Sequence, residues 1–188
     1  MGVPDLMLSS SLSDQGSTIW PMSMIGEYAR LTPAELDHAI SDPTWALEFV
    51  EEMTDAETEG SDGVEPRCLD VDKAWDSLGH LLRRAGFPVD IMHGEEEIPD
   101  AEDWGYGPPR YLTPARVRVA AEALAGLSGD SLIAGVAAVE LARDDHYPRL
   151  AEEEVSSWLT YVLHYYQALI PFFRSAAHDG DAVMLWLD

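Results

Sequence analysis

The stretch AEEEVSSWLTYVLHYYQALIPFFRSAAHDGDAVMLWLD, residues 151–188, decides the fold class of this chain. From Ala151 to about His178, large apolar side chains recur at steps of three and four residues, which predicts one long helix with a single buried stripe. The stripe comprises Trp158, Tyr161, Val162, Tyr165, Leu169, Phe172, Phe173 and Ala176. Pro171 lies within it, and we expect its ring to kink or divide the helix. After a turn at 179–181, the apolar run 182–187 predicts a strand.

The opposite end of the sequence predicts a second strand followed by two helices. Residues 24–30 alternate well enough for a strand. The segment Thr32-Pro33-Ala34-Glu35 combines an N-cap, a proline at the first helical position and a glutamate at the third, which predicts a capping box and a helix to about Ile40. Asp42-Pro43 repeats this start signal for a second helix. The acidic stretch 54–66 then predicts an exposed loop.

The middle of the chain is predominantly helical by the same criteria. Its predicted elements are, in order, a helix from Asp70 to about Ala85, a short strand at 89–92, a loop at 94–109, an extended segment at 110–112, a helix from Pro114 to about Ala125, and one or two helices within 130–143. Strands near both ends with helices between them predict an α+β fold, in which a small, mostly antiparallel sheet packs with several helices.

The length of 188 residues suits one domain, which we expect to cover residues 23–188. Residues 1–22 are rich in serine and lack periodicity, so we expect a disordered leader or a misassigned start. The single cysteine, Cys68, cannot form an internal disulfide and favours a reducing compartment. No apolar stretch is long enough to span a bilayer. These features favour a cytoplasmic protein that does not contact membranes.

The charge balance restricts the class of partner. Eleven Lys and Arg face 35 Asp and Glu, which gives a formal net charge of −24. Such a surface repels phosphate backbones, so we expect no nucleic-acid partner. It can attract a basic protein or a cation, and its simplest alternative role is to keep the domain soluble.

Four segments together resemble a known family. They are Met24-Ile25-Gly26, LDVDKAWD at 69–76, GYGPPRYLTP at 105–114 and GDAVMLWL at 180–187. In this order they resemble the YfbM-like family of uncharacterised bacterial proteins, domain of unknown function 1877. The resemblance implies an α+β fold and a bacterial cytoplasmic setting, and it carries over no activity, cofactor or catalytic residue.

Three polar residues of the predicted 70–85 helix form the first candidate site. At about 100° per residue, Asp72, Asp76 and His80 occupy an arc roughly 80° wide beside the apolar face. Carboxylates and an imidazole so placed could bind a divalent metal or act as acid and base. Alternatively, Asp72 or its neighbour Asp70 caps the helix, and Asp76 pairs with a residue one turn away.

The loop from Gly105 to Pro114 forms the second candidate, for ligand binding. Its glycines would let the backbone approach a ligand, Arg110 could hold a carboxylate or phosphate, and Tyr106 and Tyr111 could form pocket walls. Alternatively, the loop is a rigid turn in which Arg110 pairs with a nearby acid. The sequence has no phosphate-binding loop, dinucleotide fingerprint, nucleophile elbow or zinc spacing. We therefore expect no metal and no cofactor.

Two functional hypotheses follow. The first is an acidic protein-interaction or binding module with a basic protein partner. The second is a small-molecule or metal-dependent enzyme, or a ligand-binding domain, with a site between the Asp70–His80 helix and the Gly105–Pro114 loop. The sequence leaves open whether the chain is an enzyme and what its oligomeric state is.

Overall fold

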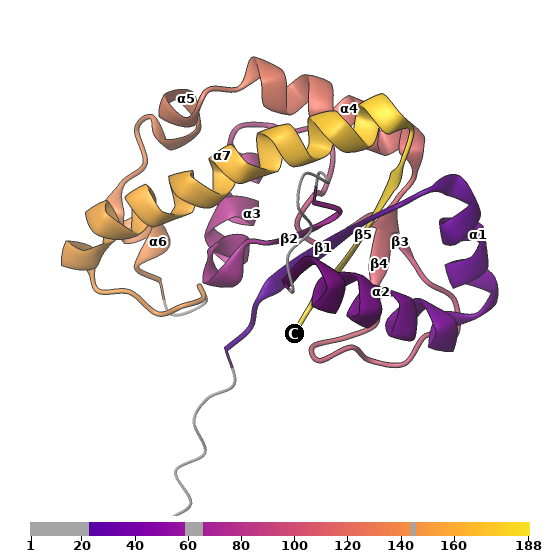
Figure 1. The fold of residues 1–188 in the computed structure, drawn as a ribbon. Coiled ribbons are helices and arrows are strands. Elements are labelled where there is room, and N and C mark those ends of the chain that lie inside the picture. The colour runs from indigo at the N-terminus through magenta and orange to yellow at the C-terminus, as the bar shows by residue number, and fades with distance from the viewer. Residues whose placement is uncertain (1–22, 59–65, 144–145) are drawn as a thin grey trace, which may run out of the picture.

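The fold is a five-stranded antiparallel sheet with helices on both faces, and the α+β prediction is confirmed (Figure 1). The computed structural model describes residues 23–58, 66–143 and 146–188. The strand order is β2-β1-β5-β4-β3. The strands are β1 (Gly26–Leu31), β2 (Cys68–Asp70), β3 (Glu96–Glu97), β4 (Arg110–Leu112) and β5 (Ala182–Leu187). The leader predicted at 1–22 lies outside the described residues.

The strand predicted at 182–187 is confirmed as β5, and it is the central strand of the sheet. It pairs with β1 from Gly26↔Leu187 to Leu31↔Ala182, and with β4 from Arg110↔Leu185 to Leu112↔Val183. Its residues alternate between the two faces of the sheet. Val183 and Leu185 belong to the larger core cluster, whereas Ala182 and Met184 belong to the smaller one. The sheet therefore divides the interior into two apolar cores.

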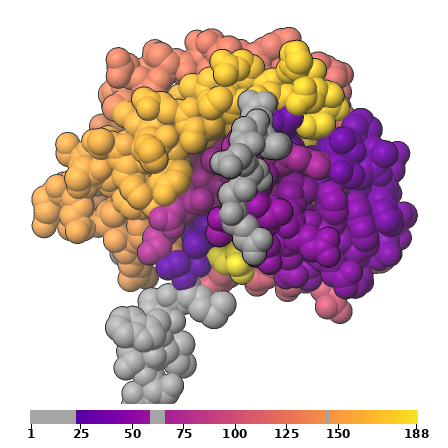
Figure 2. Space-filling model, viewed as in Figure 1, coloured from indigo at the N-terminus to yellow at the C-terminus, as the bar shows by residue number. Residues whose placement is uncertain are grey.

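The larger core lies between the sheet and four helices: α3 (Trp75–Arg84), α4 (Pro114–Gly126), α5 (Gly129–Ile133) and α7 (Val155–Asp179). Figures 1 and 2 show α7 lying across this side of the molecule. Tyr28 of β1 meets Phe172 and Phe173 of α7 edge to face, with ring centroids 6.1 and 6.4 Å apart. Its hydroxyl donates to the carbonyl of Ile91 at 2.8 Å, which satisfies the polar end of a buried ring.

Helix α7 confirms the predicted long helix, but two details of the prediction were wrong. Of the two effects predicted for Pro171, division of the helix does not occur: α7 continues through this proline, which is exposed. Tyr166 is fully buried and was not among the predicted stripe, whereas its neighbour Tyr165 is only partly buried. The Tyr166 hydroxyl donates to the Leu127 carbonyl at 2.7 Å, and this hydrogen bond to the segment between α4 and α5 holds the ring in the core. A short 3-10 turn, Glu152–Glu154, precedes the helix.

The smaller core lies on the opposite face, beneath α1 (Pro33–Ser41), α2 (Pro43–Thr58) and the loop that carries Ile98 and Trp104. The predicted capping box is confirmed. The Thr32 backbone N–H donates to Glu35 Oε2 at 2.7 Å, and the Glu35 N–H donates to Thr32 Oγ1 at 3.3 Å. In Figure 2, α1 and α2 form one flank of the molecule, away from α7.

Three predicted boundaries were wrong for identifiable reasons. Residues 54–58 continue α2 rather than forming a loop, and Glu57 accepts the N–H of Arg67 at 2.6 Å, which ties this last turn to β2. Asp70 ends a strand instead of starting a helix, because it pairs with Glu27 of β1. A 3-10 turn at Asp72–Ala74 separates it from α3.

The third error is the strand predicted at 89–92, which is a turn. The Asp90 carboxylate accepts the N–H groups of Met92 and His93 at 3.2 and 3.0 Å, so the side chain takes the place of a neighbouring strand. The remaining predicted elements are present, with α5 and α6 (Ala138–Leu141) forming the predicted pair. No helix in the described ranges has both the length and the apolar character needed to cross a membrane.

A buried ion pair joins β1 to the turn between α7 and β5. Arg30 is 3% exposed and Asp181 is 6% exposed. The Arg30 Nε and Nη2 atoms donate to Asp181 Oδ2 at 3.1 and 2.9 Å. Arg30 also contacts the half-exposed Asp179 at the last residue of α7. This pair fixes the point at which the chain turns from the long helix into the central strand.

Candidate functional site

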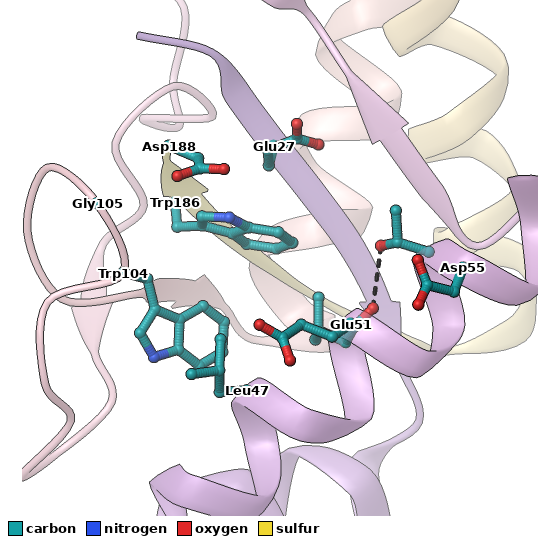
Figure 3. A pocket seen from close by; sticks show the side chains of 10 residues that line it. Glu27, Leu47, Glu51, Asp55, Trp104, Gly105, Trp186 and Asp188 are labelled. Carbon is teal, nitrogen blue, oxygen red and sulfur yellow. Dashed lines mark hydrogen bonds between the residues drawn. The ribbon is translucent and has the colours of Figure 1, made fainter. Parts of the chain in front are cut away.

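A cavity of about 570 Å³ opens between α2 and the sheet on the side of the smaller core (Figure 3). Helix α2 supplies one wall, β1 and the end of β5 supply the floor, and the loop at Trp104-Gly105 supplies the opposite wall. The volume falls in the range typical of sites for small ligands. It is larger than two other cavities, of about 140 and 240 Å³, in the described parts of the chain.

Two tryptophans form the aromatic side of the cavity. Trp104 and Trp186 meet edge to face, with ring centroids 5.5 Å apart and an interplanar angle of 76°. Figure 3 shows both indoles beside the cavity, with Leu47 of α2 close to Trp104. Trp104 is 7% exposed, so its ring is held by packing rather than free to swing. Two rings at such an angle present both a face and an edge to a ligand.

Gly105 brings this loop against the end of β5. Its φ of +94° is strained for any residue with a side chain, and an added Cβ would lie 2.7 Å from the Leu187 carbonyl oxygen. The next residue, Tyr106, donates its backbone N–H to that same oxygen at 2.9 Å. The sequence suggested that this glycine lets the backbone approach a ligand. In the structure it lets one backbone segment approach another, and this contact places Trp104 at the cavity.

Four carboxylates line the rest of the cavity: Glu27, Glu51, Asp55 and Asp188. Glu51 and Asp55 are one helical turn apart and lie on the same side of α2. Glu27 and Asp188 come from the sheet side. Among the described residues that line the cavity, none is Lys, Arg or His. The cavity therefore concentrates negative charge without an internal counter-charge.

Glu27 is the most perturbed of these acids. It lies directly opposite Asp70 in β2 and opposite Trp186 in β5, so the three side chains form a row on one face of the sheet. Its partial burial, together with the nearby charges of Asp70, Asp188 and Asp72, raises its pKa from 4.5 to about 7. Glu27 thus exchanges its proton near neutral pH.

These groups suit binding better than covalent chemistry. Indole faces attract cations through their ring quadrupole, and carboxylates form charge-assisted hydrogen bonds to ammonium or guanidinium groups. The hydroxyl among the described lining residues is Thr54, which donates to the Val50 carbonyl at 3.0 Å within α2. The cavity can therefore hold a positively charged group, and among its described lining residues no nucleophile is paired with a base.

Of the three predicted catalytic candidates, Asp72 lies in the 3-10 turn before α3, and Asp76 and His80 lie in α3, where both contact His146: Asp76 through a hydrogen bond and His80 through an edge-to-face ring contact at 4.9 Å. Asp72 accepts a hydrogen bond from the Tyr161 hydroxyl. Asp76 contacts His146 Nδ1 at 2.7 Å and accepts the Tyr147 N–H at 3.0 Å. His80 Nε2 lies 3.7 Å from a Glu140 carboxylate oxygen. Asp76 thus holds the chain segment that leads into α7.

The predicted ligand-binding residues are similarly separated. Arg110 pairs with Glu97 of β3 and reaches the backbone carbonyl of Gly94, as the alternative prediction of a nearby acid proposed. The Tyr111 hydroxyl donates to Glu96 Oε2 at 2.9 Å. Within the described residues, no hydrogen bond or ion pair joins Arg110 or Tyr111 to the α3 candidates. Tyr106 is 45% exposed and follows Gly105 at the cavity.

Comparison with known proteins identifies the family. A family model described as a domain of unknown function, DUF1877, matches residues 22–186. The chain belongs to the DUF1877 family. It is also similar to a solved structure described as a protein of unknown function, YfbM from Escherichia coli, with a TM-score of 0.60 over 88% of this chain and 100% of that one. At 19% identity this likeness shows the fold alone. No curated protein matches the chain.

The resemblance inferred from the four segments is therefore confirmed, and DUF1877 membership brings no established activity. Two of those segments, 105–114 and 180–187, contribute to the cavity through Gly105 and Trp186. The other cavity residues of this DUF1877 chain were missed by the sequence reasoning. One signal was available: the alternation of β5 puts Trp186 on the opposite face from Leu185, so a large ring had to lie outside the larger core.

Proposed function

We propose that this protein is an interaction module that receives a positively charged side chain of a basic protein partner in the α2–β5 cavity. The observation that carries this proposal is the combination of four carboxylates and two indoles around one cavity. An Arg or Lys side chain matches such a lining, because its stem is apolar and its head is cationic. The net charge of −24 would steer a basic partner toward the surface.

The cavity rim supports the same class of ligand. Leu47 is 37% exposed and lines the cavity, so it offers apolar contact to the stem of a bound side chain. Glu51 and Asp55 make the cavity-facing side of α2 acidic, which would favour the cationic head of the inserted side chain. The family and the single cysteine favour a bacterial cytoplasmic setting for this interaction.

The test is a titration with a short peptide whose ends are blocked and which carries one central Arg flanked by Lys. The comparison peptide carries citrulline, a neutral isostere, at the central position. We expect the Arg peptide to change tryptophan fluorescence and to bind at least tenfold more tightly than the citrulline peptide at low salt, with affinity falling as salt rises. Free agmatine, a small guanidinium compound, tests whether the partner's chain is needed.

Two substitutions on α2 separate the cavity from general surface charge. Glu51→Gln removes a lining carboxylate, whereas Glu52→Gln removes an exposed carboxylate that does not line the cavity. Both change the net charge by the same amount. We expect only Glu51→Gln to weaken the Arg peptide severalfold. Equal losses in both variants, or equal binding of the citrulline peptide, would refute the cavity as the receptor.

A further inference from the structure

Glu27 occupies an unusual position within the cavity. In the antiparallel register it stands directly opposite Asp70, and like charges opposite each other across two strands repel. On its other side lies Trp186, and Glu27 is itself partly buried. Removing water from a carboxylate favours its neutral form. Both effects come from the strand register, so they hold whenever the sheet is formed.

Among the described residues, the charged groups that act on Glu27 or line the cavity with it are acidic. The acids are Asp70 from β2, Asp72 from the 3-10 turn, Asp188 after β5, and Glu51 and Asp55 from α2. Cys68 of β2 is also close, and its thiol stays neutral because burial raises its pKa to about 11. A cation bound in the cavity would add a positive charge where the described lining residues supply none.

We infer that the cavity exchanges a proton for its ligand: when a cationic side chain enters, the Glu27 carboxyl releases its proton to solvent and becomes the carboxylate that faces the cation. This inference rests on the proposed function. The O–H bond of Glu27 breaks, the proton goes to the buffer, and no other bond changes. Binding is consequently tighter at higher pH, and the module binds its partner least where Glu27 is protonated.

The expected pH dependence has a defined form. Where free Glu27 is protonated and bound Glu27 is ionised, one proton leaves for each ligand bound, so affinity rises by up to tenfold per pH unit. Because the pKa of Glu27 in the free protein is about 7, this rise should occur below pH 7 and level off by pH 8. The guanidinium of an Arg peptide does not titrate in this range, so the dependence belongs to the protein.

Calorimetric titration of the same Arg peptide tests the coupling. At pH 6.5, binding heats are measured in two buffers with different ionisation enthalpies, and their difference gives the number of protons released. We expect more than half a proton for the wild-type protein and none for Glu27→Gln, which should bind with an affinity that varies little between pH 6 and 8. Glu52→Gln serves as the control and should release the same fraction as wild type.

The possible failures are distinct. If the wild-type protein binds the Arg peptide with heats independent of buffer, the coupling is wrong and the proposed function stands. If Glu27→Gln keeps the buffer dependence, another group releases the proton and the assignment to Glu27 is wrong. If the peptide does not bind at any pH between 6 and 8, the proposed function and this inference both fail.

Discussion

Glu27 of β1 and Trp186 of β5 are register partners, and their side chains leave the sheet on the same face, at the floor of the cavity. The pairing places an acid next to an indole in a row that ends with a second acid, Asp70. The neighbours of Glu27 do not stabilise the negative charge that its carboxylate carries when it is ionised. The arrangement therefore lowers stability when Glu27 is ionised, a cost that is frequent at functional sites.

The first prediction concerns the pH dependence of stability. The folded protein holds the Glu27 proton up to about pH 7, whereas the unfolded chain releases it near 4.5, so between these values the folded state binds more protons. The contribution of Glu27 to the free energy of unfolding therefore falls as pH rises through that window. Converted directly, the shift from 4.5 to about 7 corresponds to about 3 kcal/mol. Because Glu27 is only partly buried, solvent screening reduces the expected effect to about 1 kcal/mol.

Glu27→Gln should accordingly raise the free energy of unfolding by about 1 kcal/mol at pH 8 and leave it nearly unchanged at pH 4. Urea unfolding followed at both pH values measures the difference. Glu52→Gln, on the exposed side of α2, controls for the loss of one negative charge from a strongly acidic chain. A gain of the same size at pH 4 and pH 8 would show that the strand register does not perturb Glu27.

The second prediction concerns the ion pair between β1 and the start of β5. Arg30→Met leaves the Asp181 carboxylate buried without its main donor, and breaking one side of a buried pair costs about 3–5 kcal/mol. The free energy of unfolding should fall by about that amount in urea unfolding. Asp179→Asn removes the half-exposed partner of the same arginine and should cost much less. Equal losses would assign the stabilisation to Asp179 instead.

The third prediction compares two glycines that share a left-handed backbone. Gly94 has φ of +74°, and an added Cβ would lie 2.8 Å from Arg110 Cβ; Gly86 has φ of +71° with open space around it. Alanine at either position pays about 1 kcal/mol for the backbone conformation. Gly94→Ala should lose a further 1–3 kcal/mol because β4 cannot move away without leaving β5. Thermal unfolding of both variants distinguishes them, and similar melting temperatures would mean that β4 yields easily.

The sequence predicted the fold well wherever a local signal agreed with the tertiary structure. Thr32-Pro33 and Thr113-Pro114 start helices as expected, because N-caps and first-turn prolines act within a few residues. The boundary at Asp70 failed because a distant strand, β1, decided it. The burial of Tyr166 also depends on a distant residue, because its hydroxyl donates to the Leu127 carbonyl. Periodicity reports one helix face and does not identify its partners.

The candidate site was less accessible to sequence reasoning for a related reason. Motif analysis favours residues that are close in sequence, such as Asp72, Asp76 and His80. The structure pairs Asp72 with Tyr161, and it brings Asp76 and His80 to His146, on a different side of the molecule from the cavity. The cavity instead combines segments that are far apart along the chain, with Glu27 at one end and Trp186 at the other. Neither an isolated glutamate nor an isolated tryptophan forms a motif. Only the pairing of β1 with β5 brings them together.

The central place of β5 also determines when the protein can fold during its synthesis. Strand β1 leaves the ribosome early, yet both its long pairing and the Arg30–Asp181 contact, 151 residues apart, need residues made much later. Until β5 has been made, β1 and β4 lack the strand with which both of them pair. Pairings between strands so far apart in sequence form slowly. The abundant negative charge of the chain helps here, because like-charged nascent chains on neighbouring ribosomes repel each other before the final strand arrives.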